Sequence, residues 1–196
     1  RAFIHDGVDS ATLAHLVSEI IDPEPKLTAD KVYPEDMLKR LVPDHTYWIK
    51  RGISVDVLRK LEGGRAPRDE KSKLSERYIL PIRDPATNRI MGWTGRLVSD
   101  ASFGPKWKHL VRSSRAVYPL TVSREPILRA RKVVLVESVG NQLALMSGGI
   151  DYVLDLLGLN LNSRILGFLV GANLDEVIIS TDTDSERVNK VTGAIT

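Results

Sequence analysis

The sequence predicts an α/β protein in which an α+β, basic N-terminal subdomain is followed by a parallel-sheet domain. Three observations support this class. Residues 132–196 alternate compact β-branched runs with helix-like segments, as parallel sheets with crossover helices do. Residues 77–98 hold two short apolar runs separated by a turn, the pattern of a β-hairpin. Helical spacing of apolar residues precedes this hairpin.

The N-terminal part is expected to begin with an amphipathic helix at residues 8–21, followed by a Pro-rich, exposed connector. Further helices are predicted at 34–42 and at 54–61, the latter capped by Ser54. The hairpin pairs RYILPIRD with RIMGWTGRLV across the turn PATN. The basic stretch that follows has little regular pattern until PILRARK, which suits a short helix.

The C-terminal part contains three predicted strands, in KVVLVES, VLDLLG and DEVIISTDTD, with helices in GNQLALMSGG and NSRILGFLVGA between them. VVLVE and VIIST lack alternation, so both strands are expected to be buried on both faces. We therefore divide the chain into an N-terminal helix and linker (1–30), a basic subdomain (31–131) and a parallel-sheet domain (132–196).

Composition excludes several classes of protein. The chain has 196 residues, of which 42% are hydrophobic, enough for a real core. No apolar run approaches the roughly 20 residues that span a bilayer, and the start lacks a signal-peptide pattern. We expect a soluble, cytoplasmic protein with no membrane partner. The absence of Cys excludes disulfides, Cys-based zinc sites and thiol catalysis within this chain.

Charge is divided unevenly along the chain. Residues 1–131 carry 24 Lys and Arg against 17 Asp and Glu, whereas residues 132–196 carry 4 against 8. The most basic stretch, 101–131, has seven cations and one anion. Such a stretch suits a polyphosphate partner, because neutralising phosphates releases counterions. A solvated basic face is the alternative explanation.

Acidic side chains follow two of the predicted parallel strands. Glu137 ends one strand, and Asp182 and Asp184 end another. Ligands of open α/β sheets gather at the carboxyl ends of the strands, and carboxylates that converge there repel unless a cation neutralises them. Oxygen ligands suit Mg²⁺ or Mn²⁺, which catalyse phosphoryl transfer. The alternative is that the two Asp residues form a polar turn that caps a helix, with Glu137 an incidental surface acid.

The order of VVLVES, NQLALMSGGI, DLLGLN and VIISTDTD resembles the topoisomerase-primase (Toprim) domain, with a Glu after one strand and Asp-x-Asp after a later one. Upstream, YWIKRGISVDVLRKL, the hairpin, PKWKH and AVYPL resemble the basic subdomain of bacterial replicative primases, especially those of tailed phages. The resemblance covers roughly residues 45–193. It has no counterpart of the zinc ribbon and helicase-contacting regions of that family, which suggests a catalytic core alone, with its Toprim domain shortened at the C-terminal end.

The resemblance implies roles for particular residues. Glu137, Asp182 and Asp184 are expected to hold the catalytic Mg²⁺ or Mn²⁺. The nucleotide and template groove is expected to include Arg51, Arg96 and Lys106, with Arg83 and Lys108 as weaker candidates. Where the family has Gly after the Glu and an acid four residues beyond it, this chain has Ser138 and Asn141. Asn141 is a further candidate ligand through its amide oxygen.

The function implied is that of a DNA primase core, a DNA-directed RNA polymerase that makes short RNA primers on single-stranded DNA from ribonucleotide triphosphates. A replicative helicase is the expected partner, through regions outside this sequence, and the host cytoplasm is the expected location if a phage encodes the protein. Two alternatives stay open, a Toprim-type metal-dependent nuclease and a noncatalytic nucleic-acid-binding module. Two aromatic residues, Trp93 and Trp107, are candidates for stacking on bases or for core packing, and His109 for a phosphate contact.

Overall fold

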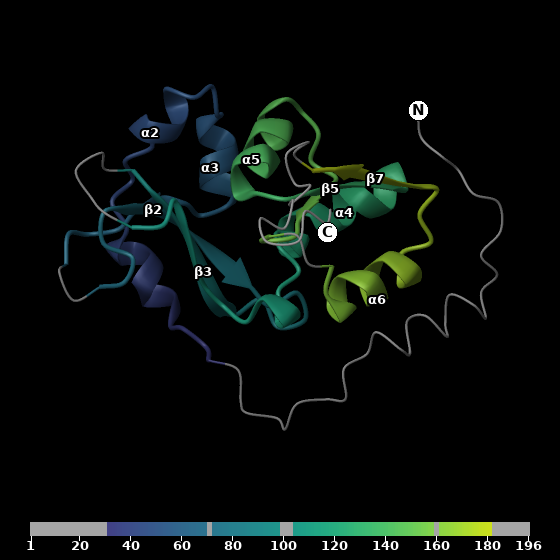
Figure 1. Cartoon of the computed structure of the whole chain (residues 1–196), viewed down its shortest axis with the longest axis horizontal. Coiled ribbons are helices and arrows are strands. Elements are labelled where there is room, and N and C mark those ends of the chain that lie inside the picture. The colour runs from purple at the N-terminus through teal and green to yellow at the C-terminus, as the bar shows by residue number, and fades with distance from the viewer. Residues whose placement is uncertain (1–30, 70–71, 99–103, 159–160, 182–196) are drawn as a thin grey trace, which may run out of the picture.

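The computed structural model describes residues 31–69, 72–98, 104–158 and 161–181. These residues form a four-stranded antiparallel sheet, order β1-β2-β3-β4, and a three-stranded parallel sheet, order β6-β5-β7 (Figure 1). The predicted fold class, an α+β part followed by a parallel sheet, is confirmed. The helix expected at residues 8–21 lies outside the described residues. No helix among the residues described is both long and apolar enough to cross a bilayer.

The antiparallel sheet is built around the predicted hairpin. Strands β2 (Arg77–Arg83) and β3 (Ile90–Leu97) pair along their length, with a register shift at Ile82/Arg83. The connecting turn is stabilised by Asp84, whose Oδ1 accepts hydrogen bonds from the backbone N–H groups of Ala86 and Thr87, each at 2.9 Å. Edge strands β1 (Gly64–Arg65) and β4 (Trp107–Leu110) complete the sheet. The pattern of the basic stretch did not predict β4.

Short helices precede the hairpin. The segment expected to be helical at 34–42 contains a 3-10 helix, η1 (Glu35–Arg40), and a one-turn helix, α2 (Thr46–Ile49), follows it. The helix predicted at 54–61 is confirmed as α3 (Val55–Lys60), and its cap Ser54 accepts a hydrogen bond from the Asp56 N–H. After β4 come a short 3-10 turn, η2 (Ser113–Arg115), and α4 (Leu120–Ala130), which begins before the predicted PILRARK helix.

The parallel sheet follows the predicted order of strand and helix. Its strands are β5 (Lys132–Val136), β6 (Val153–Asp155) and β7 (Glu176–Ser180), and its crossover helices are α5 (Val139–Ser147) and α6 (Ser163–Gly171). β5 is buried, as predicted. The expectation that β7 is buried on both faces is wrong for the part of the chain that the structure describes, because β7 is an edge strand whose five residues are exposed there.

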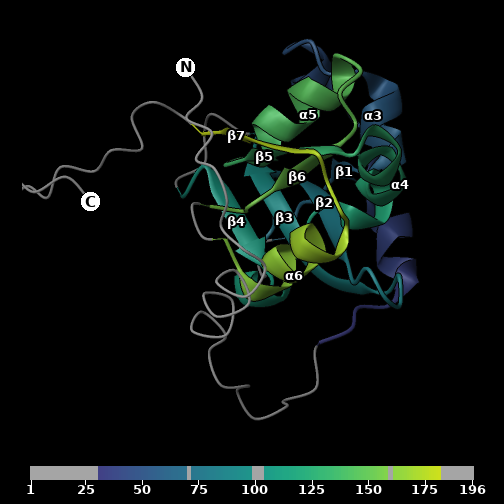
Figure 2. The ribbon, with the colours of Figure 1, turned by 90° about the vertical axis from the view of Figure 1, so that its right-hand side faces the viewer.

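One apolar cluster joins the two sheets. It combines side chains of the antiparallel sheet and α3 with one face of the parallel sheet and with α5: Leu58, Leu80, Ile82, Val136 and Leu143 are among its most buried members. Figure 2 shows α5 beside α3, and the Ser54 N–H donates to Ser147 Oγ at 3.0 Å between them. The shared core therefore holds the basic part against the acidic sheet.

The other face of the parallel sheet packs on α4 and α6. Leu120, Ile127 and Ile165 form a second cluster with Val133 and Leu135. The helix that precedes residue 131 thus packs with the strands that follow it. The division of the chain at this residue stays a prediction.

Candidate metal and nucleic-acid site

The acidic side of the site lies at the carboxyl edge of the parallel sheet. β5 is the central strand, with Val136 opposite Asp155 of β6 and Ser180 of β7. Glu137 follows β5 directly. Asp182 and Asp184 lie outside the described residues, but β7, which leads to them, runs parallel to β5 and in register with it. The described residues by themselves contain no group of three or more His, Asp or Glu side chains placed to hold a metal.

Glu137 is suited to hold a cation because one of its carboxylate oxygens lacks a partner. Its Oε2 is buried and has no hydrogen bond within the described part of the chain. A buried carboxylate oxygen without a donor is costly, and a bound cation removes that cost. The donor set therefore fits Mg²⁺ or Mn²⁺, which prefer oxygen ligands.

The first turn of α5 places two of the residues that depart from the Toprim pattern. Ser138 is the N-cap of this helix, and its Oγ accepts a hydrogen bond from the Asn141 N–H at 3.4 Å. This capping gives Ser138 a structural role at the position where the family has Gly. Asn141 is half-buried one turn from Glu137, so its place among the candidate ligands stays a prediction.

Asp155 is an acidic residue that the sequence interpretation missed. It is the last residue of β6 and is 1% exposed. Its Oδ1 accepts a 2.6 Å hydrogen bond from the Leu157 N–H, whereas Oδ2 is buried without a partner among the described residues. Burial raises the pKa of Asp155 to about 7, the hydrogen bond from Leu157 opposes this rise, and the charge of Glu137 adds to it. The strand-end rule that selected Glu137 applies equally to this residue.

The basic side of the site is organised around Tyr47. The Arg51 guanidinium lies 3.6 Å from the centre of the Tyr47 ring, and Arg96 Nε donates to the Tyr47 hydroxyl at 2.9 Å. Arg96 also lies 5.6 Å from the ring centre of Trp107, its partner across β3 and β4. Two of the predicted groove cations are thus brought together from segments 45 residues apart. Lys106, the third, is exposed and directly precedes Trp107.

An aromatic stack connects the basic side to the acidic edge. Trp107 stacks on Trp48 with ring centres 6.1 Å apart, and Trp48 is buried in the core shared by the two sheets. The Trp48 Cη2 atom lies 3.9 Å from the point where a Cβ on Gly140 would stand. Gly140 lies in the first turn of α5, three residues after Glu137. The predicted cations and Glu137 therefore flank one aromatic wall.

A pocket of about 310 Å³ opens beside Tyr47. Its lining includes Arg51 and two cations that the sequence interpretation did not select, Lys50 and Arg65, with Asp44 as its acid. Asp44 and Arg65 form an ion pair at 3.4 Å. Lys50 and Arg51 leave the pocket with an excess of positive charge, which suits a phosphate-bearing ligand.

Arg77 is a second cation that the sequence did not single out. It is 5% exposed and donates to the carbonyl oxygens of Gly95 and Pro105, at 3.1 and 2.9 Å. Burial, and then the charge of Arg96, lower the pKa of this guanidinium. Arg77 fastens the segment that carries Lys106 to the sheet. Nothing in the sequence pattern distinguishes it from a surface Arg.

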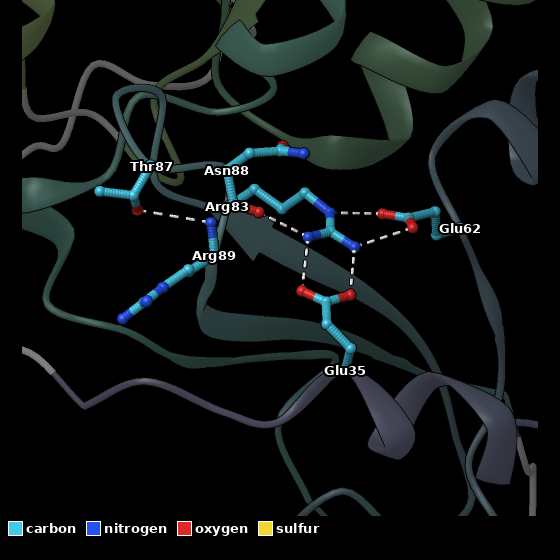
Figure 3. Close-up of polar contacts among 6 residues, drawn as sticks. All are labelled: Glu35, Glu62, Arg83, Thr87, Asn88 and Arg89. Carbon is cyan, nitrogen blue, oxygen red and sulfur yellow. Dashed lines mark hydrogen bonds and ion pairs between the residues drawn. The ribbon is translucent and has the colours of Figure 1, made fainter.

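Arg83 has a different environment from the other candidates. Its guanidinium forms paired hydrogen bonds with Glu35 and with Glu62, at 2.6 to 2.9 Å, and donates to the Asn88 carbonyl (Figure 3). Five contacts to acceptors leave little capacity for a phosphate. The geometry therefore counts against Arg83 as a nucleotide or template contact and favours a structural role.

The remaining candidates differ in exposure. Lys108 is half-buried in β4 and pairs with Gly95 of β3. His109 Nδ1 shares a 3.0 Å hydrogen bond with Thr94 Oγ1, and burial lowers its pKa, which makes it a poor partner for phosphate. Trp93 is 2% exposed in a core cluster, so it packs internally, whereas Trp107 is half-buried at the groove.

Known proteins with similar sequences are DNA primases. The chain is 29% identical to the DNA primase of Borreliella burgdorferi over 145 residues, which are 71% of this chain and 27% of that protein. It is 31% identical to the DNA primase of Myxococcus xanthus over 114 residues, 56% of this chain and 18% of that protein. The chain therefore spans less than a third of the length of the curated relatives it matches. No protein-family model matches it.

Solved structures share the fold. The zinc-binding and RNA polymerase domains of the Aquifex aeolicus primase match 69% of this chain and 41% of that chain, with a TM-score of 0.60 and 25% identity. A DnaG primase catalytic domain bound to single-stranded DNA matches 90% of this chain and 64% of that chain, with a TM-score of 0.65 and 18% identity. In sequence and in fold, the chain resembles the catalytic core of bacterial DNA primases, as its motifs predicted.

Proposed function

We propose that this chain is a DNA primase core that makes short RNA primers on single-stranded DNA by metal-dependent nucleotidyl transfer. The observation that carries the proposal is the single aromatic wall, Trp48 and Trp107, flanked by Arg51 and Arg96 on one side and by the α5 turn after Glu137 on the other. A polymerase needs this combination, a basic track for the template beside carboxylates at a sheet edge. The similarity to DNA primases supports it.

In the proposed mechanism, Arg51, Arg96 and Lys106 bind backbone phosphates of the template and of the incoming ribonucleotide triphosphate. Arg96 is held by Tyr47 and Trp107, so its guanidinium is oriented before the ligand arrives. Glu137, Asp182 and Asp184 would hold Mg²⁺ or Mn²⁺. When bound, such a metal supplies charge that activates a nucleotide 3′ hydroxyl and stabilises the departing pyrophosphate.

The proposed division of labour follows the predicted domains, with residues 31–131 binding nucleic acid and residues 132–196 holding metal. A replicative helicase as partner and action in the cytoplasm, of the host cell if a phage encodes the protein, belong to the same proposal. Lys50 and Arg65 beside the Tyr47 pocket are additional proposed phosphate contacts.

The first experiment tests catalysis. The chain is incubated with a single-stranded DNA template, a short annealed RNA with a free 3′ hydroxyl, ribonucleotide triphosphates and Mg²⁺ or Mn²⁺. Supplying the RNA separates elongation from initiation. We expect extended RNA and an intact template. Metal-dependent cleavage of the template without extension would instead identify a Toprim-type nuclease, and binding without either reaction would identify a noncatalytic module.

The second experiment tests the residues. Asp182→Ala and Asp184→Ala are expected to abolish extension and to leave single-stranded DNA binding within about twofold, because the basic side binds the template. Arg96→Gln is expected to weaken DNA binding roughly tenfold, the effect of losing one charge-assisted phosphate contact. The matched control is Arg129→Gln, an exposed α4 cation paired with Glu125. Equal losses in Arg96→Gln and Arg129→Gln would contradict the proposed groove.

A further inference from the structure

Asp155 stands at the same sheet edge as Glu137 without having been assigned a function. β5, which leads to Glu137, is the central strand of the parallel sheet, and β6, which ends in Asp155, is its neighbour on the side away from β7. The segments after the two strands are also tied together. The Leu156 N–H donates to the Val136 carbonyl at 2.9 Å, and the Gly158 N–H donates to the Glu137 carbonyl at 3.2 Å.

Both carboxyl groups have an oxygen that the described residues leave unsatisfied. Asp155 is 1% exposed, and its Oδ2 is buried without a hydrogen-bond donor in the part of the chain described, as is Oε2 of Glu137. A buried polar atom without a partner is rare in native structures, because its lost hydration is not replaced. Two such oxygens on neighbouring strand ends indicate a missing positive ligand rather than two unrelated defects.

The other Asp155 oxygen shows that the side chain is oriented. Oδ1 accepts from the Leu157 N–H at 2.6 Å, and Leu157 has φ +51°, so the carboxyl group is held by the turn that ends β6. A carboxylate fixed by one oxygen and unpartnered at the other is arranged like a metal ligand supported by its own backbone.

We propose that Asp155 is a further carboxylate of the divalent-metal site, and that its Oδ2 and Glu137 Oε2 serve the same bound cation, directly or through a water ligand of that cation. The inference rests on the proposed function, because it concerns the same site. It adds a carboxylate from a third strand, so that β6, β5 and β7 each contribute acid to one edge of the sheet. Asp155 thereby supplies the negative charge that Asn141 does not bring.

The test is a titration of each protein with Mn²⁺ alone, followed by calorimetry and by the electron paramagnetic resonance signal of free Mn²⁺. Asp155→Asn keeps the shape and the acceptor for Leu157 and removes the charge. We expect it to weaken Mn²⁺ binding by roughly tenfold or more, the effect of losing a site carboxylate or its support. Asp151→Asn removes the same charge four residues earlier, outside the site, and is expected to stay within about twofold of the parent.

A double-mutant cycle with Glu137→Gln separates a shared cation from a general charge effect. If both oxygens serve one cation, the losses in Mn²⁺ affinity are expected to be non-additive. Thermal unfolding with and without Mn²⁺ provides a second readout, in which Asp155→Asn folds but loses most of the stabilisation that the metal confers on the parent. If Asp155→Asn does not fold, Asp155→Ser, which keeps an acceptor for Leu157, replaces it.

The outcomes distinguish the two proposals. Mn²⁺ affinity unchanged in Asp155→Asn, in a parent chain that binds Mn²⁺ and extends RNA, would overturn the role of Asp155 and leave the proposed function standing. A parent chain that binds no Mn²⁺ would overturn both.

Discussion

The cluster of Arg83, Glu35 and Glu62 is expected to be a structural tie, and its removal is expected to destabilise the protein without weakening nucleic-acid binding directly. The guanidinium joins three separate segments, namely η1, the turn after α3 and the β2–β3 hairpin (Figure 3). The perturbation is Arg83→Met, which keeps the aliphatic length of the side chain and removes every donor. Two carboxylates that face one cation would then face each other.

The magnitude follows from burial. The Arg83 side chain is 12% exposed, whereas those of Glu35 and Glu62 are 59% and 40% exposed. Removing one partner of a fully buried pair costs about 3–5 kcal/mol, and an exposed pair contributes about 0–1 kcal/mol. The carboxylates here can rehydrate but the guanidinium is nearly buried, so we expect a loss of about 2 kcal/mol. In a chain of this size that corresponds to roughly 4–8 °C in Tm.

The assay is urea denaturation followed by circular dichroism, with Arg89→Met as the matched control. Arg89 is an exposed cation of the same hairpin and is expected to change the free energy of unfolding by less than about 0.5 kcal/mol. A pH series adds a second criterion. The hydrogen bond from Arg83 lowers the pKa of Glu35 in the folded state, so its contribution to stability is present above the unfolded pKa and is lost as pH falls through the folded pKa. The difference between parent and Arg83→Met is therefore expected to shrink in acid, below about pH 4.

Two results would refute this reasoning. One is a loss of stability in Arg83→Met no larger than that in Arg89→Met. The other is a folded Arg83→Met protein that loses single-stranded DNA affinity as strongly as Arg96→Gln does, which would restore Arg83 as a nucleic-acid contact.

Three further predictions concern packing and pH. Gly92→Ala is expected to cost about 1–3 kcal/mol, because the new Cβ would stand 2.6 Å from the Val111 Cβ; the matched control, Gly167→Ala on α6, meets no atom within 4 Å and is not expected to destabilise. Leu143→Ala should cost about 2–5 kcal/mol in urea denaturation, since this fully buried side chain joins the two sheets, and a loss under 1 kcal/mol would argue against a shared core. Burial lowers the pKa of His109 in the folded state, so its contribution to stability is present above about pH 6.5, the unfolded value, and is lost as pH falls through the folded pKa. His109→Gln is therefore expected to lose less stability than the parent between pH 7 and pH 5, and identical pH profiles would contradict this.

The parallel sheet was the part of the fold most accessible from sequence. Compact β-branched runs alternate with capped helical segments, and local signals such as Ser54 and Asn162 mark the caps. The hairpin was equally accessible, because Asp84 and the residues after it form a self-contained turn. β4 was not accessible, since its four half-buried residues show no alternation and the strand exists only through pairing with β3.

The candidate site divides in the same way. The sequence alone determined that Glu137 ends a strand, that Asp182 and Asp184 follow another, and that cations concentrate upstream, because residue type and strand order are local properties of the chain. The tertiary structure decided which of these groups meet. It brought Arg51 and Arg96 to one Tyr47 ring, gave the Arg83 guanidinium to two glutamates, and buried Asp155 beside Glu137. The reason is physical: whether a charged side chain faces solvent, a carboxylate or another strand end depends on contacts between segments far apart in sequence, and the core between the two sheets fixes those contacts.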